Sequence, residues 1–129
     1  MTEDKKQLVL VVEDNEDNRV LISMILNKSG YQTIWADTGL KGVQFAAEQA
    51  PDFVLLDIQL PDIEGTEVLQ RIRRLETAAA SVPIIAMTSY AMSGDREKLL
   101  AAGCDGYIEK PIDPMRVIAQ IQSIVGNSQ

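Results

Sequence analysis

Short apolar segments alternate with amphipathic segments along this chain, and the alternation restricts the fold more than any other sequence feature. Residues 7–12 and 53–56 are short apolar runs, as in strands buried on both faces of a parallel sheet. Further strands are predicted at residues 31–36, 84–87 and 106–108. Strands that alternate with helices form a parallel sheet with helices on both faces. We therefore expect a doubly wound α/β fold with five strands.

Apolar residues at helical intervals, capping residues and prolines indicate the helices between these strands. Asn15 and Asp17 are suited to cap the first helix, which should end before Gly30, and Asp37 and Thr38 to cap a second helix through Gln49. The apolar positions that indicate the first, third and fifth helices are Val20, Leu21, Met24 and Ile25; Val68, Leu69, Ile72 and Leu75; and Val117, Ile118, Ile121, Ile124 and Val125. A fourth helix is expected over residues 94–102, the last should start at Pro114, and the Ala-rich connection before Pro83 should be loose.

Length and charge exclude several functional classes. With 129 residues, the chain is expected to form a single domain over residues 1–129. Its formal net charge of −7 would repel nucleic acid and anionic membranes. No apolar stretch approaches the roughly 20 residues that span a bilayer, and the N-terminus is polar where a signal peptide is apolar. We therefore expect a cytoplasmic protein with no membrane insertion and no nucleic-acid partner.

Histidine is absent and cysteine occurs once, which removes further possibilities. A chain without histidine has no Ser-His triad and no phosphohistidine of its own, and it lacks the commonest zinc ligand. Cys104, flanked by small residues, is expected to be packed in the interior rather than reactive.

Polar residues that could carry chemistry follow four of the predicted strands. Glu13 and Asp14, Asp57, Thr88 with Ser89, and Lys110 come at or just after strand ends, where ligands bind in open parallel sheets. A single acid in such a position is more often a helix cap, so the combination carries the argument. Carboxylates about 4 Å apart repel by around 4 kcal/mol per pair at an effective dielectric near 20. Their crowding therefore predicts a divalent cation, Mg²⁺ or Mn²⁺.

Four stretches at these strand ends resemble the response-regulator receiver domains. They are VVEDN at 11–15, LLDIQLPDIEG at 55–65, IIAMTSYAM at 84–92 and GCDGYIEKPI at 103–112, and the resemblance runs from about residue 8 to 125. It implies a CheY-like, flavodoxin-like sheet in the order 2-1-3-4-5. It also implies a cis peptide between Lys110 and Pro111.

The resemblance further implies a role for each matching residue. Asp57 is the expected phosphoacceptor, with Glu13, Asp14 and the backbone carbonyl of Gln59 as its metal-binding partners. Thr88 and Lys110 are expected to bind phosphoryl oxygens, and Thr88 and Tyr107 to move on activation. Two positions, Glu13 and Tyr90, depart from the family's commonest pattern. Glu13 stands where the family more often has Asp and is expected to reach the ion through water, and the bulky Tyr90 is expected to slow self-dephosphorylation.

A chain of this kind needs other proteins as donor and target. The family implies a histidine kinase or phosphotransfer protein as donor, docking on the first helix near Val20, Ile22 and Met24. Output is expected through the fourth helix, the fifth strand and the fifth helix to a downstream protein. We expect a free-standing monomer or weak dimer that is not an enzyme but assists its own phosphorylation and dephosphorylation.

Two other functions compete with this interpretation. An aspartyl-nucleophile phosphatase of the haloacid-dehalogenase type also places an Asp at a strand end beside Mg²⁺, but it needs a second Asp two residues later, where this chain has Gln59. A receiver-like scaffold that is never phosphorylated would tolerate loss of the site residues. All five of them are present: Glu13, Asp14, Asp57, Thr88 and Lys110.

Overall fold

The computed structural model describes residues 7–89 and 93–126, which fold around one parallel sheet. The strands are β1 (Leu8–Val12), β2 (Gln32–Ala36), β3 (Phe53–Asp57), β4 (Ile84–Thr88) and β5 (Gly106–Glu109). Their order is β2-β1-β3-β4-β5, and every neighbouring pair is parallel. The expected doubly wound α/β fold with the order 2-1-3-4-5 is therefore confirmed. The extent of the domain over residues 1–129 stays a prediction.

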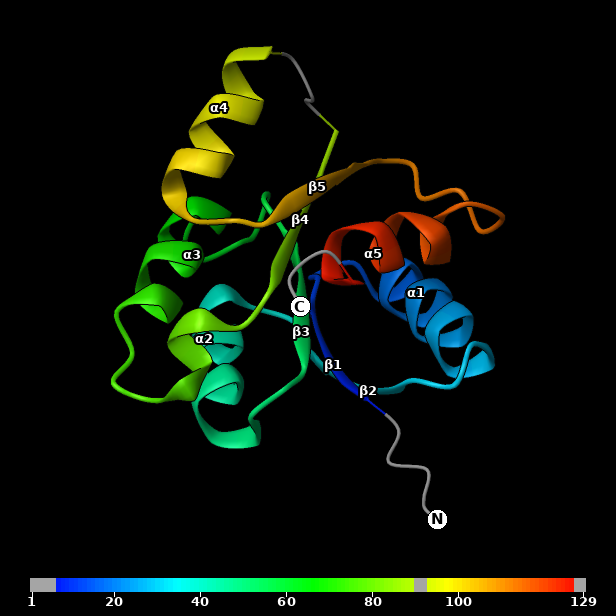
Figure 1. Cartoon of the computed structure of the whole chain (residues 1–129), viewed down its shortest axis with the longest axis horizontal. Helices are drawn as coiled ribbons and strands as arrows, with labels where there is room; N and C mark the ends of the chain where they lie inside the picture. The colour runs from blue at the N-terminus through cyan, green and yellow to red at the C-terminus, as the bar shows by residue number, and fades with distance from the viewer. Residues whose placement is uncertain (1–6, 90–92, 127–129) are drawn as a thin grey trace.

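Helices cover both faces of the sheet. In Figure 1, α1 (Glu16–Lys28) and α5 (Val117–Gly126) lie on one side of the strands, and α2 (Gly39–Gln49), α3 (Gly65–Arg73) and α4 (Ser93–Ala102) lie on the other. Within residues 7–89 and 93–126, no helix is both long and apolar enough to cross a bilayer. The arrangement leaves the carboxyl ends of the strands as one edge of the sheet, where loops can converge.

Two apolar layers hold the helices on the sheet. Because successive strand side chains point to opposite faces, Leu10 and Val12 of β1 join the layer under α2, α3 and α4, whereas Val9 and Val11 join the layer under α1 and α5. All four of these side chains are buried, as are the five residues of β3. Continuous apolar strands are what a sheet covered on both faces requires. Cys104 is also buried, as predicted.

Several helix ends agree with the capping residues predicted from the sequence. The side chain of Asn15 accepts a hydrogen bond from the Asn18 N–H at 2.9 Å and begins α1, and the Thr38 hydroxyl accepts one from the Lys41 N–H at 3.1 Å and begins α2. Gly30 follows α1 with φ +96°, a conformation that favours glycine. Asp17 and Asp37 do not cap these helices: Asp17 lies within the first turn of α1, and Asp37 pairs with Lys41.

Three further details differ from the sequence-based expectations. The last helix begins at Val117 rather than Pro114, because residues 114–116 form a turn whose Met115 N–H donates to the Asp113 carboxylate at 2.9 Å. The Ala-rich connection is not loose throughout, since Ala78–Ser81 forms a short 3₁₀-helix. On α1, the expected docking residue Ile22 is only 3% exposed and packs against the sheet, whereas Val20 and Met24 are exposed.

A close backbone contact at Gly65 holds the start of α3 against the segment that follows Asp57. A Cβ added at Gly65 would lie 2.5 Å from the Ile58 Cα and 2.9 Å from the Asp57 carbonyl oxygen. Backbone atoms cannot yield as a flexible side chain can, so Gly65→Ala should lower the free energy of unfolding by about 1–3 kcal/mol. Urea denaturation measures the change. The control is Gly126→Ala, because a Cβ added there would have nothing within 4 Å. The stability of this variant should be unchanged or slightly higher. Equal urea midpoints for Gly65→Ala and the wild type would contradict the prediction.

Candidate functional site

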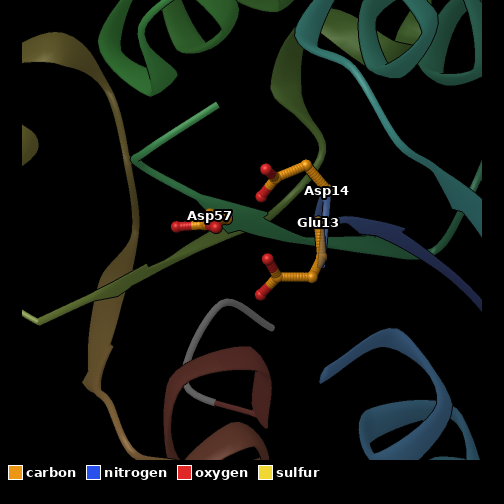
Figure 2. Close-up of side chains that lie close together, drawn as sticks. All are labelled: Glu13, Asp14 and Asp57. Atoms are coloured by element: carbon orange, nitrogen blue, oxygen red, sulfur yellow. The ribbon is translucent and has the colours of Figure 1, made fainter. Parts of the chain in front are cut away.

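Three carboxylates gather at the carboxyl edge of the sheet. Glu13 and Asp14 follow β1, and Asp57 is the last residue of β3, so the hydrogen-bonded pairing of β1 with β3 brings them together. One carboxylate oxygen from each lies within 4.8 Å of the other two. Figure 2 shows the three side chains projecting from these strand ends into the same space. The sequence prediction that these acids converge is confirmed.

Asp57 is held at both of its carboxylate oxygens. The side chain is buried, and its Oδ1 accepts a hydrogen bond from the Gln59 backbone N–H at 3.0 Å. Its Oδ2 lies 3.0 Å from the Lys110 Nζ. The backbone is fixed as well: the next residue, Ile58, donates its N–H to the Met87 carbonyl at 3.2 Å, which extends the pairing of β3 with β4 just past Asp57. The carboxylate therefore has a fixed orientation at the carboxyl edge of the sheet.

Lys110 brings a positive charge to this cluster from beyond the end of β5. Its backbone N–H donates to the Thr88 carbonyl at 2.9 Å, which places the residue beside β4. Its Nζ lies 3.2 Å from the Glu13 Oε1 as well as 3.0 Å from the Asp57 Oδ2. Burial alone would lower the pKa of Lys110, but the hydrogen bond and charge of Asp57 and the charge of Glu13 raise it above its usual value. Lys110 therefore carries its charge at neutral pH. The Lys110-Pro111 peptide bond is cis, as the resemblance implied.

Glu13 is the least accessible acid of the cluster. Its side chain is 1% exposed, its Oε2 accepts a hydrogen bond from the Asn15 N–H at 3.3 Å, and its Oε1 accepts none despite the nearby ammonium. Burial raises the pKa of Glu13 to about 7, with a further rise from the neighbouring Asp57, against the lowering effect of Lys110. A buried carboxylate with an oxygen that lacks a hydrogen bond is incompletely neutralised by the protein itself.

The donor set fits a hard divalent cation. Every available side-chain ligand is a carboxylate oxygen. Because three acids face one lysine, the cluster keeps a net negative charge when all four groups are ionised. Oxygen ligands in small number are what Mg²⁺ prefers, because it retains several of its waters. The Glu13 Oε1 that accepts no hydrogen bond is the observation that calls for such an ion most directly. An acidic site of this composition is consistent with Mg²⁺; Mn²⁺ stays a prediction.

Thr88 and Tyr107 lie on the same face of the sheet. Thr88 ends β4 and is 5% exposed, and Tyr107 of β5 pairs in register with Ala86, two residues before Thr88. Residues opposite each other in a pair share a face, as do residues two apart along one strand. Tyr107 is half-buried and packs against the apolar layer under α2, α3 and α4. The switch roles that the resemblance implies for both residues stay predictions.

Gln59 and Tyr90 are also predicted to contribute to the site. Gln59 is placed beside Asp57 by the hydrogen bond of its N–H, and the metal-binding role of its carbonyl stays a prediction. Tyr90, expected to shield the site, lies outside the described residues.

Sequence reasoning missed two side chains that support the loops of the site. Asp62, in the loop after β3, accepts hydrogen bonds from the Gly39 and Leu40 N–H groups at 2.8 and 2.9 Å and so caps α2. Desolvation would raise the pKa of Asp62, but these backbone donors lower it overall. Arg19 donates to the carbonyls of Glu13 and Asp14 at 3.1 and 3.2 Å. No spacing rule signals a contact between separate loops, although an arginine five residues after an acid pair could have drawn notice.

Comparison with known proteins gives one consistent result. A family model described as the response regulator receiver domain matches residues 9–122. The polar-differentiation response regulator DivK of Brucella ovis is 42% identical over 120 residues, which cover 93% of this chain and 97% of that relative. The DivK protein of Brucella anthropi is 41% identical over the same coverage.

Solved structures agree with this result. The receiver domain of the sensor histidine kinase PA1611 from Pseudomonas aeruginosa, solved with a magnesium ion coordinated in its active site cleft, is 35% identical with a TM-score of 0.85, covering 95% of this chain and 99% of that one. The chemotaxis response regulator CheY4 of Vibrio cholerae reaches a TM-score of 0.88 at 23% identity, covering 93% and 99% of the two chains, which supports the fold alone.

Proposed function

Because this chain belongs to the response regulator receiver family of two-component signalling, we propose that Asp57 accepts a phosphoryl group from a phosphohistidine of a partner protein. The observation that carries the proposal is the buried Asp57 carboxylate, fixed between an acid pair and the Lys110 ammonium at the carboxyl edge of the sheet. A buried nucleophile with a cation at hydrogen-bonding distance is suited to receive a phosphoryl group, because the negative charge on the phosphoryl oxygens must be neutralised.

The transfer exchanges one bond to phosphorus for another. A carboxylate oxygen of Asp57 forms the new O–P bond as the P–N bond to the donor imidazole breaks, and the departing ring takes the electron pair and a proton. Gln59 and Lys110 hold the carboxylate in place, at 3.0 Å from its two oxygens, so little reorganisation precedes attack. Lys110 then has a phosphoryl oxygen as a further partner.

The acid cluster has a defined part in this reaction. Glu13, Asp14, Asp57 and the Gln59 carbonyl would hold Mg²⁺, with Glu13 acting through water, and the bound ion would neutralise charge on the phosphoryl oxygens. Support comes from the close approach of the three carboxylates and from the magnesium ion seen in the PA1611 receiver domain. Through these residues the chain assists its own phosphorylation and dephosphorylation without being an enzyme.

Thr88 and Tyr107, which lie on the same face of the sheet, change conformation in response to the phosphoryl group. It adds about −1.5 to −2 charges and three acceptor oxygens beside the end of β4. The Thr88 hydroxyl turns to donate to one of these oxygens, and Tyr107 rotates inward into the space that Thr88 leaves. Their common face and neighbouring strands support this coupling. Phosphorylation at Asp57 thereby changes the surface formed by β5 and its neighbours.

Donor and target are other proteins. A groove beside the site is lined by α1 residues, by Ser89 and by the segment after β5, including Asn18, Leu21, Lys110 and Ile112. This groove and the exposed Val20 and Met24 are where a histidine kinase or phosphotransfer protein would dock. A downstream protein binds through α4, β5 and α5, and the chain acts in the cytoplasm as a monomer or weak dimer. A nearly complete population shift needs about 5.5 kcal/mol of differential binding, so target and phosphoryl group act together.

Phosphoryl uptake from a small donor tests the proposal. The protein is incubated with acetyl phosphate and Mg²⁺, and intact mass spectrometry should show the addition of one phosphoryl group, which peptide mapping places on Asp57. Chelation of the ion should prevent the addition. Unchanged mass in the presence of Mg²⁺, or modification of another side chain, would refute the assignment and favour the scaffold that is never phosphorylated.

A further inference from the structure

Arg19 joins the acid pair to the neighbouring edge strand. Its Nη1 donates to the carbonyl oxygens of Glu13 and Asp14, at 3.1 and 3.2 Å. On the other side, its guanidinium carbon lies 4.3 Å from the centre of the Trp35 ring on β2. The side chain is half-buried, and its own backbone N–H continues α1 by donating to the Asn15 carbonyl at 3.0 Å. One residue thus connects the turn between β1 and α1 with the first turn of the helix and with β2.

These contacts bear on the orientation of the two carboxylates. Glu13 and Asp14 are consecutive, and the backbone torsions between them determine where each side chain points. The Glu13 N–H is fixed by the Ala36 carbonyl at 3.0 Å, and Arg19 fixes both carbonyls that follow. Without Arg19, this turn would keep the bond to β2 and the hydrogen bonds of Asn15, but the two carbonyls would lose their side-chain donor. The carboxylate of Asp14, which is exposed, would then be free to leave the cluster.

The Trp35 ring restricts the guanidinium in turn. The indole is 51% exposed, and its flat face can hold a planar cation that would otherwise sample several rotamers in water. Trp35 pairs in register with Val11, two residues before Glu13. The ring therefore stands on a rigid part of the sheet close to the turn that Arg19 supports.

We propose that Arg19 is a positioning residue that fixes the turn carrying Glu13 and Asp14 for Mg²⁺ binding, and that Trp35 holds its guanidinium in place. The inference rests on the proposed function, since it concerns the same metal site. Arg19 acts through the backbone of the acid pair and touches neither the ion nor the phosphoryl group.

The sign of the effect separates positioning from simple electrostatics. A cation near a metal site repels Mg²⁺, so an arginine acting only by its charge would weaken binding, and its removal would tighten it. A positioning arginine does the opposite: its removal weakens binding despite the lost repulsion. Arg19→Lys keeps the charge but loses the planar guanidinium, whose Nη1 reaches both carbonyls while the group lies over Trp35, whereas Arg19→Gln loses the charge as well.

Calorimetric titration of the whole chain with MgCl₂ at pH 8 measures the effect. Both Arg19→Lys and Arg19→Gln should raise the dissociation constant of Mg²⁺ about tenfold, the lower end of the range for residues that orient metal ligands. Trp35→Leu should raise it about two- to fivefold, the share that an exposed cation–π contact can contribute. Matched controls are Arg71→Lys and Arg71→Gln, because Arg71 lies on α3, where its exposed side chain pairs with Glu67 at 2.8 Å. These should bind Mg²⁺ as the wild type does.

A second readout separates positioning from general stability. In two-dimensional amide spectra without metal, Arg19→Lys should shift the resonances of residues 13–15 and leave those of α3 and α5 in place. Wild-type affinity in Arg19→Lys, or tighter binding in Arg19→Gln, would overturn the inference, and should Arg19 variants fail to fold, unchanged affinity in Trp35→Leu would do so. Failure of the wild type itself to bind Mg²⁺ would instead refute the proposed function.

Discussion

Asp57→Asn is expected to abolish phosphoryl uptake from acetyl phosphate, with no added mass after an incubation that converts most of the wild type. The amide lacks the negative charge and the nucleophilic oxygen of the carboxylate, and neither Asp14 nor Glu13 is held between the Gln59 N–H and the Lys110 Nζ as the Asp57 carboxylate is. The variant should remain folded. Of the two acids that remain in the cluster, Glu13 should become more stable as an anion, because Asp57 contributes to its raised pKa.

A charge-matched control accompanies this variant. Asp17→Asn removes the same charge from the exposed first turn of α1 and should leave uptake at the wild-type level. Intact mass spectrometry over a time course measures both proteins. Uptake by Asp57→Asn at the wild-type rate, or loss of uptake in Asp17→Asn, would mean that the phosphoryl group is carried elsewhere or that uptake follows overall charge.

Without Mg²⁺, the protein should become less stable as the pH rises from about 5 to 8. The pKa of Glu13 is about 7 in the folded protein against an ordinary value of 4.5, so the folded state binds a proton that the unfolded state has released. The stability associated with this proton is fully present below pH 4.5 and is lost as the pH rises through 7. At 1.36 kcal/mol per pH unit, the loss amounts to about 3 kcal/mol.

The composition lacks the side chain that ordinarily titrates in this pH window. The chain has no histidine, and the pKa values of Asp37 and Asp62 are lowered and that of Cys104 is raised, all away from the range between 5 and 7. Urea denaturation at several pH values in the presence of a chelator measures the slope. Glu13→Gln should be more stable than the wild type at pH 8 and nearly independent of pH across the window.

Two comparisons make this result specific. Glu16→Gln, which changes an exposed glutamate in the first turn of α1, should retain the wild-type slope. Mg²⁺ at a hundred times its dissociation constant should restore about 2.7 kcal/mol at pH 8 and much less at pH 5, where protons compete for the carboxylates. A flat stability profile for the metal-free wild type between pH 5 and 8 would show that Glu13 ionises without cost.

Much of the fold, and the convergence of three acids at one edge of the sheet, could be predicted from the chain alone. Apolar runs such as residues 53–56 specify strands buried on both faces, and caps such as Asn15 and Thr38 specify where helices begin, because both signals act over a few neighbouring residues. Parallel strands have their carboxyl ends at one edge of the sheet. The predicted alternation of strands and helices therefore implied that Glu13, Asp14 and Asp57 lie close together, as they do.

The remaining features were decided by contacts between segments distant in sequence. Sequence periodicity did not show that α1 buries Ile22 and exposes Val20 and Met24, because an apolar stripe wider than the buried face leaves its orientation to packing. The raised pKa of Glu13 depends on how deeply β1 is covered and on its approach to Asp57, and the contact of Arg19 with Trp35 depends on the register of β1 with β2. Local sequence determines which elements form and which chemical groups stand at their ends. Burial and charge–charge distance depend on the assembled tertiary structure, which alone sets how strongly those groups act on one another.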